Sequence, residues 1–245
     1  MTSYLEFKGL SKRYSDSWAL HNIDLQVKKG EVFGIIGSSG AGKTTLLRII
    51  ATLEKPSKGT IRFDGIELNG LSDKETLLIR RRMGIVFQNP IVFKRSVYEN
   101  VAYGLRIRGI TEDLINIKVK KALQLIGLLR LGERRATTLS GGEAQRLALV
   151  RTTVVEPELL LLDEPTANLD PANVALMEHA ISETVKNQET TVIMATHNMF
   201  QAERLADRVA FLLNGELIEV AETDQIFKFP KDKRTGAFVR GEMIY

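Results

Sequence analysis

The run of eight residues from Gly37 to Thr44 constrains the fold of this chain most strongly. It reads Gly-Ser-Ser-Gly-Ala-Gly-Lys-Thr and matches the phosphate-loop pattern G-x-x-x-x-G-K-[ST]. It lies between residues 31–36, which read as a buried strand, and residues 45–50, which read as a helix. Glycines let a backbone turn tightly and aim its N–H groups at an anion, and the following helix adds its positive end. A Gly- and Ser-rich surface turn is the alternative, but the strand-loop-helix context favours a nucleotide site.

Two side chains at the end of this loop carry the chemistry that a nucleotide site needs. We expect Lys43 to reach the β- and γ-phosphates and Thr44 to offer its hydroxyl group to Mg²⁺. Backbone N–H groups would supply the other contacts. The predicted phosphate-binding residues are Gly37, Ser38, Ser39, Gly40, Ala41, Gly42, Lys43, Thr44 and Thr45.

A pair of carboxylates follows a second apolar run. Residues 159–162 are four consecutive leucines, which read as a buried strand, and Asp163 and Glu164 come directly after them. Ligands of parallel sheets bind at the carboxyl ends of the strands, where the phosphate loop also lies. We expect Asp163 to hold Mg²⁺ through water and Glu164 to act as general base. The alternative is an acidic strand end that caps a helix after Pro165.

His197 and Gln88 also follow predicted strands. His197 comes after residues 191–195, where we expect it to contact the γ-phosphate and to share a hydrogen-bonded network with Glu164. Gln88 comes after residues 83–87, where its amide is expected to bind Mg²⁺ and to detect the γ-phosphate. A lone histidine is usually structural, so its position after the strand is what indicates a function. The predicted catalytic residues are Glu164, His197, Gln88 and Lys43.

The composition is that of an ordinary globular protein. The chain has 245 residues, of which 44% are hydrophobic and 26% are charged. No apolar run approaches the roughly 20 residues of a membrane helix, and the first residues lack the pattern of a secretion signal. Cysteine is absent, which excludes disulfides and thiol catalysis. We therefore expect a cytoplasmic chain that reaches a membrane only through a partner.

Two basic clusters raise the question of a nucleic-acid partner. They are residues 80–82, which are all arginine, and the group Lys118, Lys120 and Lys121, in a chain of formal net charge +4. Acidic residues are interspersed along the chain, and no aromatic stacking motif accompanies the clusters. We interpret them as solvated surface and expect no nucleic acid as a partner; an ATPase that acts on nucleic acid is the alternative.

The order of the segments predicts an α/β fold. Short alternating strands come first, a helical stretch fills the middle, and apolar strands alternate with helices afterwards. This order predicts a mostly parallel sheet with flanking helices, buried on both faces, and an antiparallel β part near the N-terminus. The last dozen residues are expected to form a loosely packed tail. We expect a single domain over residues 1–245, with residues 1–89 and 157–235 as nucleotide-binding core and residues 90–156 as helical subdomain.

Residues 139–146 open one of the predicted helices. Ser140 is a suitable N-cap, and Glu143 stands three residues later, as in a capping box. A capping box alone would explain these residues as the start of a helix. However, Gly141 and Gly142 before a helix N-terminus also suit an anion, which would be a second phosphate-binding surface in one chain.

Taken in order, these elements resemble the nucleotide-binding subunit of ATP-binding cassette transporters over nearly the whole chain. The resemblance implies a P-loop NTPase core with an inserted helical subdomain, which binds ATP and Mg²⁺ and hydrolyses ATP. It places Thr44, Gln88 and Asp163 around the metal. The matching elements are Tyr14, the phosphate loop, Gln88, the signature at 139–145, Asp163–Glu164, the turn at 168–170 and His197.

The resemblance also implies roles that spacing alone does not show. Tyr14 would stack on adenine, with Trp18 as a rival close in sequence. Ser140 and the two glycines after it would bind the γ-phosphate of ATP held by a second copy of the chain. Asp170 would link the two sites. The working unit would therefore be a head-to-tail dimer that sandwiches two ATP molecules.

Residues 99–105 resemble the importer members of this family. The resemblance implies that residues 89–104 receive a coupling helix of a permease on an apolar floor. The implied partners are permease subunits and, indirectly, an extracytoplasmic solute-binding protein, which places the chain on the cytoplasmic face of the cell membrane. The expected floor residues are Ile91, Val92, Phe93, Val97 and Tyr98.

The solute is suggested only by a further resemblance. Residues 87–90, residues 101–105 and the ending at 241–245 look like those of importers for tungstate, molybdate or phosphate. An importer subunit for another solute, such as an amino acid, is one alternative. A soluble cassette ATPase of iron–sulfur assembly or of the ribosome is another.

Overall fold

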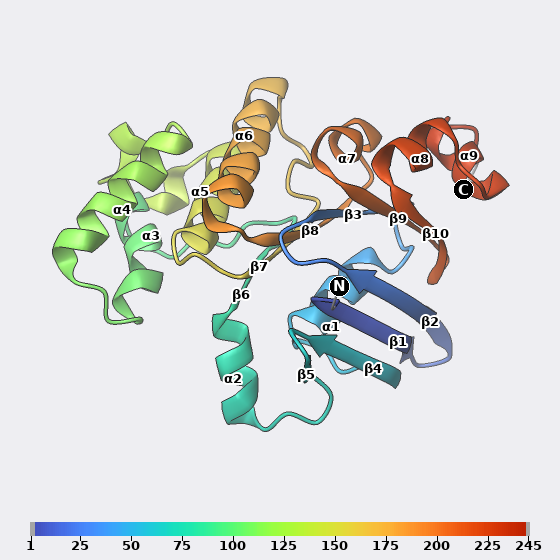
Figure 1. Cartoon of the computed structure of the whole chain (residues 1–245). Coiled ribbons are helices and arrows are strands. Elements are labelled where there is room, and N and C mark those ends of the chain that lie inside the picture. Colours follow the sequence, from blue (N-terminus) through green and yellow to red (C-terminus); the bar gives the residue numbers. More distant parts are fainter. Residues whose placement is uncertain (1–2, 244–245) are drawn as a thin grey trace.

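A six-stranded sheet forms the centre of the protein (Figure 1). The computed structural model describes residues 3–243, apart from the side chains of residues 187 and 188. The strand order is β10–β9–β3–β8–β7–β6, and only the β10–β9 pair is antiparallel. The predicted mostly parallel sheet is thereby confirmed. The strands are β3 (Val32–Ile36), β6 (Met83–Val86), β7 (Leu159–Asp163), β8 (Thr191–Thr196), β9 (Arg208–Leu213) and β10 (Glu216–Glu222).

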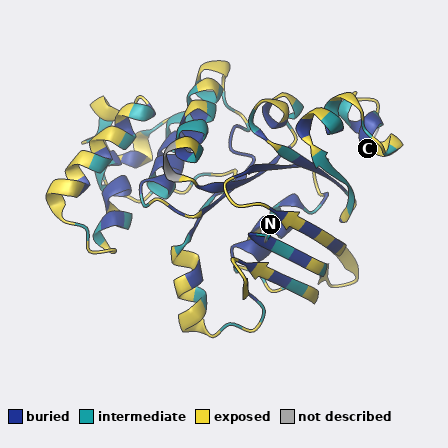
Figure 2. Ribbon diagram, viewed as in Figure 1, coloured by how far each residue is buried: buried dark blue, intermediate teal, exposed yellow. Residues whose placement is uncertain are grey.

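A second, antiparallel sheet is built from the N-terminal part of the chain, in the order β2–β1–β4–β5. Buried and exposed residues alternate along its strands, as expected for a sheet with one face on the core (Figure 2). Helix α1 (Lys43–Ile50) lies between the two sheets and contacts β2, β7 and β8. The strands are β1 (Leu5–Tyr14), β2 (Ser17–Val27), β4 (Lys58–Phe63) and β5 (Ile66–Glu67).

The four leucines of β7 pack into two separate hydrophobic cores. Leu159 and Leu161 pack with α1 and the antiparallel sheet, whereas Leu160 and Leu162 pack with helices on the other face. Successive side chains of a strand point to opposite faces, so a strand that is apolar at every position must be covered on both sides. The phosphate loop and the carboxylates therefore start from a rigid, fully buried support.

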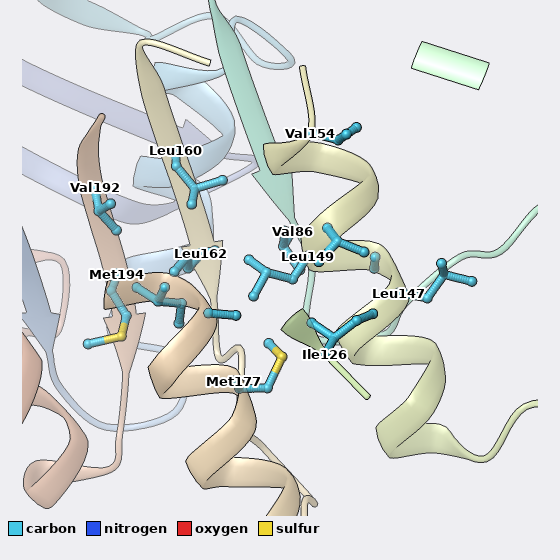
Figure 3. Packing of buried hydrophobic residues seen from close by; sticks show 14 of the residues in the cluster. Val86, Ile126, Leu147, Leu149, Val154, Leu160, Leu162, Met177, Val192 and Met194 are labelled. Atoms are coloured by element: carbon cyan, nitrogen blue, oxygen red, sulfur yellow. The ribbon is translucent and has the colours of Figure 1, made fainter. Parts of the chain in front are cut away.

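Three helices lie between β6 and β7 in the chain, namely α3 (Val97–Arg106), α4 (Glu112–Leu125) and α5 (Gly141–Thr153). Helix α5 contacts β6, and α3 and α4 pack on α5 (Figure 1). In Figure 3, Val86, Leu149, Ile126 and Met177 converge where α5 and α6 meet the sheet. Two short 3₁₀ turns, Leu129–Leu131 and Ala136–Thr138, connect α4 to α5. Helix α6 (Pro171–Gln188) follows β7 and packs on α5.

The expectation of a loose C-terminal tail is wrong. Helix α9 follows an Asp232 N-cap, and Phe238 in that helix is only 6% exposed because its ring stacks on Phe211 at 4.5 Å. Residues 244 and 245, part of the ending noted above, lie outside the described residues. Within residues 3–243, no helix is long and apolar enough to cross a membrane. The remaining helices are α2 (Asp73–Arg81), α7 (Met199–Leu205), α8 (Thr223–Lys228) and α9 (Lys233–Val239).

Candidate nucleotide-binding and hydrolysis site

Four neighbouring parallel strands end at the same edge of the central sheet, and the predicted site residues follow them. The phosphate loop follows β3, Asp163 ends β7 and Glu164 comes directly after it, His197 follows β8, and Gln88 lies two residues after β6. The carboxyl ends of parallel strands meet at one edge, so these residues gather there. Gln88, Glu164, His197 and loop residues 37–45 all line one cavity of about 900 Å³.

The phosphate loop can adopt this path only with glycine at two positions. Gly42, the N-cap of α1, has a φ of 103°, and a Cβ there would lie 2.4 Å from the Ala19 carbonyl oxygen. A Cβ at Gly37 would lie 2.2 Å from the Leu212 carbonyl oxygen. Larger residues would push the loop away from the N-terminus of α1, where the free N–H groups favour an anion.

Lys43 folds back over its own loop. Its Nζ donates to the carbonyl oxygens of Gly37, at 2.8 Å, and Ser38, at 2.9 Å, and lies 3.6 Å from a carboxylate oxygen of Glu164. Burial lowers the pKa of Lys43, and the charge of Glu164 opposes that shift. The ammonium group is therefore held at the mouth of the loop by partners that a phosphate group can replace.

Thr44 and Asp163 form the pair expected to hold Mg²⁺. Thr44 Oγ1 donates to Asp163 Oδ1 over 3.0 Å, and Asp163 is only 4% exposed. Burial raises the pKa of Asp163, against the opposing hydrogen bond from Thr44. A hydroxyl and a carboxylate are the oxygen ligands that Mg²⁺ prefers, and a cation would favour the ionised carboxylate, so the pair fits the metal. Within residues 3–243 no three His, Cys, Asp or Glu side chains cluster as metal ligands.

Glu164 lies between Lys43 and His197. One carboxylate oxygen faces Lys43, and the other lies 2.8 Å from His197 Nδ1 and accepts from the His197 backbone N–H at 3.2 Å. The backbone N–H of Glu164 donates to the Ala195 carbonyl oxygen at 2.9 Å. Its φ of 48° falls in the left-handed region, which glutamate seldom adopts and which functional sites can retain. The carboxylate is thus fixed and buried, while the imidazole is 63% exposed.

The signature residues lie at the N-terminus of α5 and do not line this cavity as the structure describes it. Ser140 accepts from the Glu143 N–H and donates its hydroxyl to the Glu143 carboxylate, which completes the predicted capping box. The Ser140 backbone N–H and hydroxyl lower the pKa of Glu143. Gly142 faces Asn173, which in turn binds Asp170, the N-cap of α6. These residues therefore sit together, apart from the phosphate loop of the same chain.

Neither aromatic residue considered for adenine lines the cavity as described. Tyr14 is 42% exposed, and its hydroxyl donates to the Glu54 carboxylate. Trp18 is 38% exposed, with Lys58 Nζ 5.5 Å from its ring centroid. Ala19, the residue after Trp18, does line the cavity. Both exposed rings thus lie close in sequence to the cavity wall.

The C-terminal helices supply a wall that the motifs did not predict. Residues 238–241, together with Phe200 and Phe227, line the same cavity as the phosphate loop. The sequence interpretation placed residues 238–241 in the expected tail, and no motif marked them as functional. Their only signal is apolar spacing, which is typical of any packed helix.

The ABC transporter family matches residues 20–167 of this chain. The chain is 40% identical to the phosphate import ATP-binding protein PstB 2 of Natronomonas pharaonis, over 98% of this chain and 88% of that protein. It is also 40% identical to the methionine import ATP-binding protein MetN of Bordetella avium, over 96% of this chain and 66% of that protein.

A solved structure agrees with the fold. It is a dimeric ATP-binding cassette in a post-hydrolysis state, bound to ADP and Pi. It superimposes with a TM-score of 0.83 and 30% sequence identity, over 89% of this chain and 98% of that chain.

Proposed function

Since this chain belongs to the ABC transporter family and is one of its ATP-hydrolysing import subunits, we propose that it powers the import of an inorganic oxyanion. The proposed solutes are phosphate, molybdate and tungstate, moved through a separate permease. The observation that carries the hydrolytic mechanism is the position of the Glu164 carboxylate. It is held between Lys43 and His197, beside the Thr44–Asp163 pair.

In this mechanism the phosphate loop and Lys43 bind the β- and γ-phosphates of ATP. Lys43 exchanges its bonds to loop carbonyls for bonds to phosphate oxygens. Thr44, Gln88 and Asp163 hold Mg²⁺, which when bound neutralises phosphate charge. Tyr14 stacks on adenine, and Trp18 is its rival.

Glu164 acts as the general base of this mechanism. It takes a proton from a water molecule as that water attacks the γ-phosphorus, and the bond to ADP breaks. His197 orients the carboxylate through Nδ1, and its exposed ring contacts the γ-phosphate. The left-handed backbone of Glu164 aims the side chain across the ends of β7 and β8.

We assign the signature residues to the ATP of a second copy. Ser140, Gly141 and Gly142 lie at an exposed or half-exposed helix N-terminus, away from their own phosphate loop. Asp170 connects to Gly142 through Asn173 and so lies where it can link the two sites. A head-to-tail dimer brings each signature to the other copy's ATP, and the solved cassette with ADP and Pi is itself dimeric.

The surface after Gln88 is proposed to receive the permease. Ile91 is 72% exposed, and Phe93 and Tyr103 pack edge to face at 5.2 Å with partly exposed rings. Val97, expected in this floor, is fully buried and belongs to the core instead, because α3 turns it inward. Docking here places the chain on the cytoplasmic face of the cell membrane, with a solute-binding protein on the far side.

A division of the chain into a core and a helical subdomain is part of this proposal. We propose that residues 1–89 and 157–235 form the nucleotide-binding core and residues 90–156 the helical subdomain. The permease surface and the signature then both belong to the helical part, whereas the phosphate loop and Glu164 belong to the core. A rotation between the parts would connect ATP binding to the permease.

The relatives favour an oxyanion but leave methionine as a second candidate. Identity is 40% to both import proteins, yet the alignment covers 88% of the phosphate protein and 66% of the methionine protein. The permease and the solute-binding protein select the solute, so the test must include them. We expect one of the oxyanions phosphate, molybdate or tungstate, and not methionine, to stimulate ATP hydrolysis by the complete transporter in vesicles.

The hydrolytic mechanism is tested by Glu164→Gln. The amide keeps the size of the side chain but cannot take a proton, so kcat should fall ~100-fold or more while ATP affinity is kept. ATP should then hold the variant as a dimer, seen by size-exclusion chromatography with light scattering. Glu183→Gln, a change on α6, is the control and should hydrolyse ATP normally. Wild-type turnover by Glu164→Gln would remove the assignment of Glu164 as base.

A further inference from the structure

A buried glutamine of α5 holds the backbone just before Gln88. Gln145 is 3% exposed, and its Nε2 donates to the Phe87 carbonyl oxygen over 3.2 Å. That carbonyl belongs to the peptide group that joins Phe87 to Gln88. Since a peptide group is planar, the direction of this carbonyl also sets the direction of the Gln88 N–H and the start of its side chain.

The far end of the same segment is also tied to helices. Asn100 of α3 is fully buried, accepts from the Phe93 N–H at 2.8 Å and donates to the Phe93 carbonyl oxygen at 3.2 Å. The guanidinium carbon of Arg151, on α5, lies 4.8 Å from the Phe93 ring centroid. Residues 87–93 are therefore held at both ends by α3 and α5, while exposed Gln88 lies between these ties and lines the nucleotide cavity.

Only one end of the buried Gln145 amide has a hydrogen-bond partner among the described residues. Its Oε1 is buried and has no hydrogen-bond partner among the described residues. A buried oxygen without a partner destabilises the fold, and an apolar side chain of similar length would avoid this. The amide therefore contributes chiefly through its one bond, to Phe87.

We propose that Gln145 is a positioning residue that transmits the position of the signature helix to Gln88. The proposal rests on the role given to Gln88 in the proposed function. Ser140 lies five residues before Gln145 on the same helix, roughly 7.5 Å along its axis. When Ser140 binds the ATP of a second copy, α5 moves as a unit, and Gln145 turns the Phe87–Gln88 peptide toward the γ-phosphate and its metal.

The test is a double-mutant cycle in the full chain, with steady-state ATP hydrolysis as the readout. Gln145→Met removes the donor but keeps length and burial. We expect kcat to fall about fivefold, as for one lost buried hydrogen bond, with the KM for ATP unchanged and Tm equal or higher. In a Gln88→Ala background, the same Gln145→Met change should lower kcat no further, because Gln145 acts only through Gln88.

The matched control is Gln201→Met. Gln201 of α7 is also fully buried, and its amide atoms have no hydrogen-bond partner among the described residues. This variant should keep the wild-type kcat. Gln145→Leu serves as a second apolar variant if the methionine packs poorly.

Two outcomes would overturn the proposal and are distinguishable from each other. If Gln88→Ala slows hydrolysis while Gln145→Met does not, or if their effects multiply in the double variant, Gln145 does not act through Gln88. If Gln88→Ala leaves kcat unchanged, the role of Gln88 in the proposed function fails, and the relay fails with it.

Discussion

Glu164, the proposed general base, shows how much the position of a side chain depends on backbone geometry. Its place after four leucines was enough to predict a carboxylate at the end of a strand beside the phosphate loop. Its φ of 48° and its place between Lys43 and His197 were not predictable. A left-handed glutamate has no sequence signature, because tertiary contacts rather than the residue's own preference maintain it.

Arg82 gives a residue-scale prediction about stability. Its guanidinium binds both carboxylate oxygens of Glu158 at 2.7 Å and also binds Asp64, while the Tyr4 hydroxyl donates to Glu158 at 3.1 Å. Each residue of this cluster lies next to the end of a strand, two beside the antiparallel sheet and two beside the central sheet, although the Glu158 side chain is 43% exposed. A bidentate pair within such a network is stronger than an isolated surface ion pair.

We expect Glu158→Gln to lower Tm at pH 7 by about 2–4 °C. The hydrogen bonds from Arg82 hold the pKa of Glu158 below its usual range. The stabilisation is therefore complete above the pKa of the unfolded chain and is lost as pH falls through the lower folded-state pKa. The Tm difference should shrink toward pH 3. Glu67→Gln, which breaks the exposed pair with Arg62, is the control and should change little. A difference that grows at acid pH would contradict the assignment.

At the scale of elements, strands with a strong apolar pattern could be predicted from the sequence. The capping signal at the start of α2 was not used. The strands predicted at residues 31–36, 83–87, 159–162 and 191–195 lie close to their expected positions, because a short, continuous apolar run bounded by turn residues marks a strand that is buried on both faces. Helix α2 was missed even though Ser72 and Glu75 form a capping box at its start. Its residues face mostly solvent, so no apolar stripe revealed it. Helices α8 and α9 were missed because they are short and depend on packing rather than on propensity.

The contact between β6 and α5 gives a prediction at this scale. A Cβ at Gly84 would lie 2.4 Å from Thr152 Cγ2, so the strand and the helix touch with no room for a methyl group. Gly84→Ala should lower the free energy of unfolding by about 1–3 kcal/mol, measured by urea denaturation, since threonine has little rotamer freedom to yield.

The matched second change is Thr152→Ser. It removes the methyl group but keeps the hydroxyl that donates to the Ala148 carbonyl oxygen at 2.8 Å. In this background Gly84→Ala should lose most of its effect, because the clashing atom is gone. Equal destabilisation in both backgrounds would mean that the clash is not the cause.

At the scale of the whole molecule, one chain assembles only part of the proposed site. The sequence placed the phosphate loop, Glu164, His197 and Gln88 together, and the structure brings all of them to one cavity. Spacing in the sequence could not show that Ser140 lies outside this cavity, because a helix cap and a phosphate site need the same residue types. Only the fold separates the two surfaces, and their separation is what makes a second copy necessary in the proposed function.

A mixing experiment tests that arrangement. Lys43→Ala should disable the phosphate loop and leave the signature intact, whereas Ser140→Arg should block the signature and leave the loop intact. Each variant alone should be inactive. In a mixed head-to-tail dimer, the intact loop of one chain faces the intact signature of the other, which restores one of the two sites. With random pairing half of the dimers are mixed, so about a quarter of wild-type hydrolysis should return if the sites act independently. Replacing the Ser140→Arg chain with one that carries both changes should restore nothing, because no intact loop is then present. If the two single variants mixed together also stay inactive, Ser140 does not complete the site of a second copy.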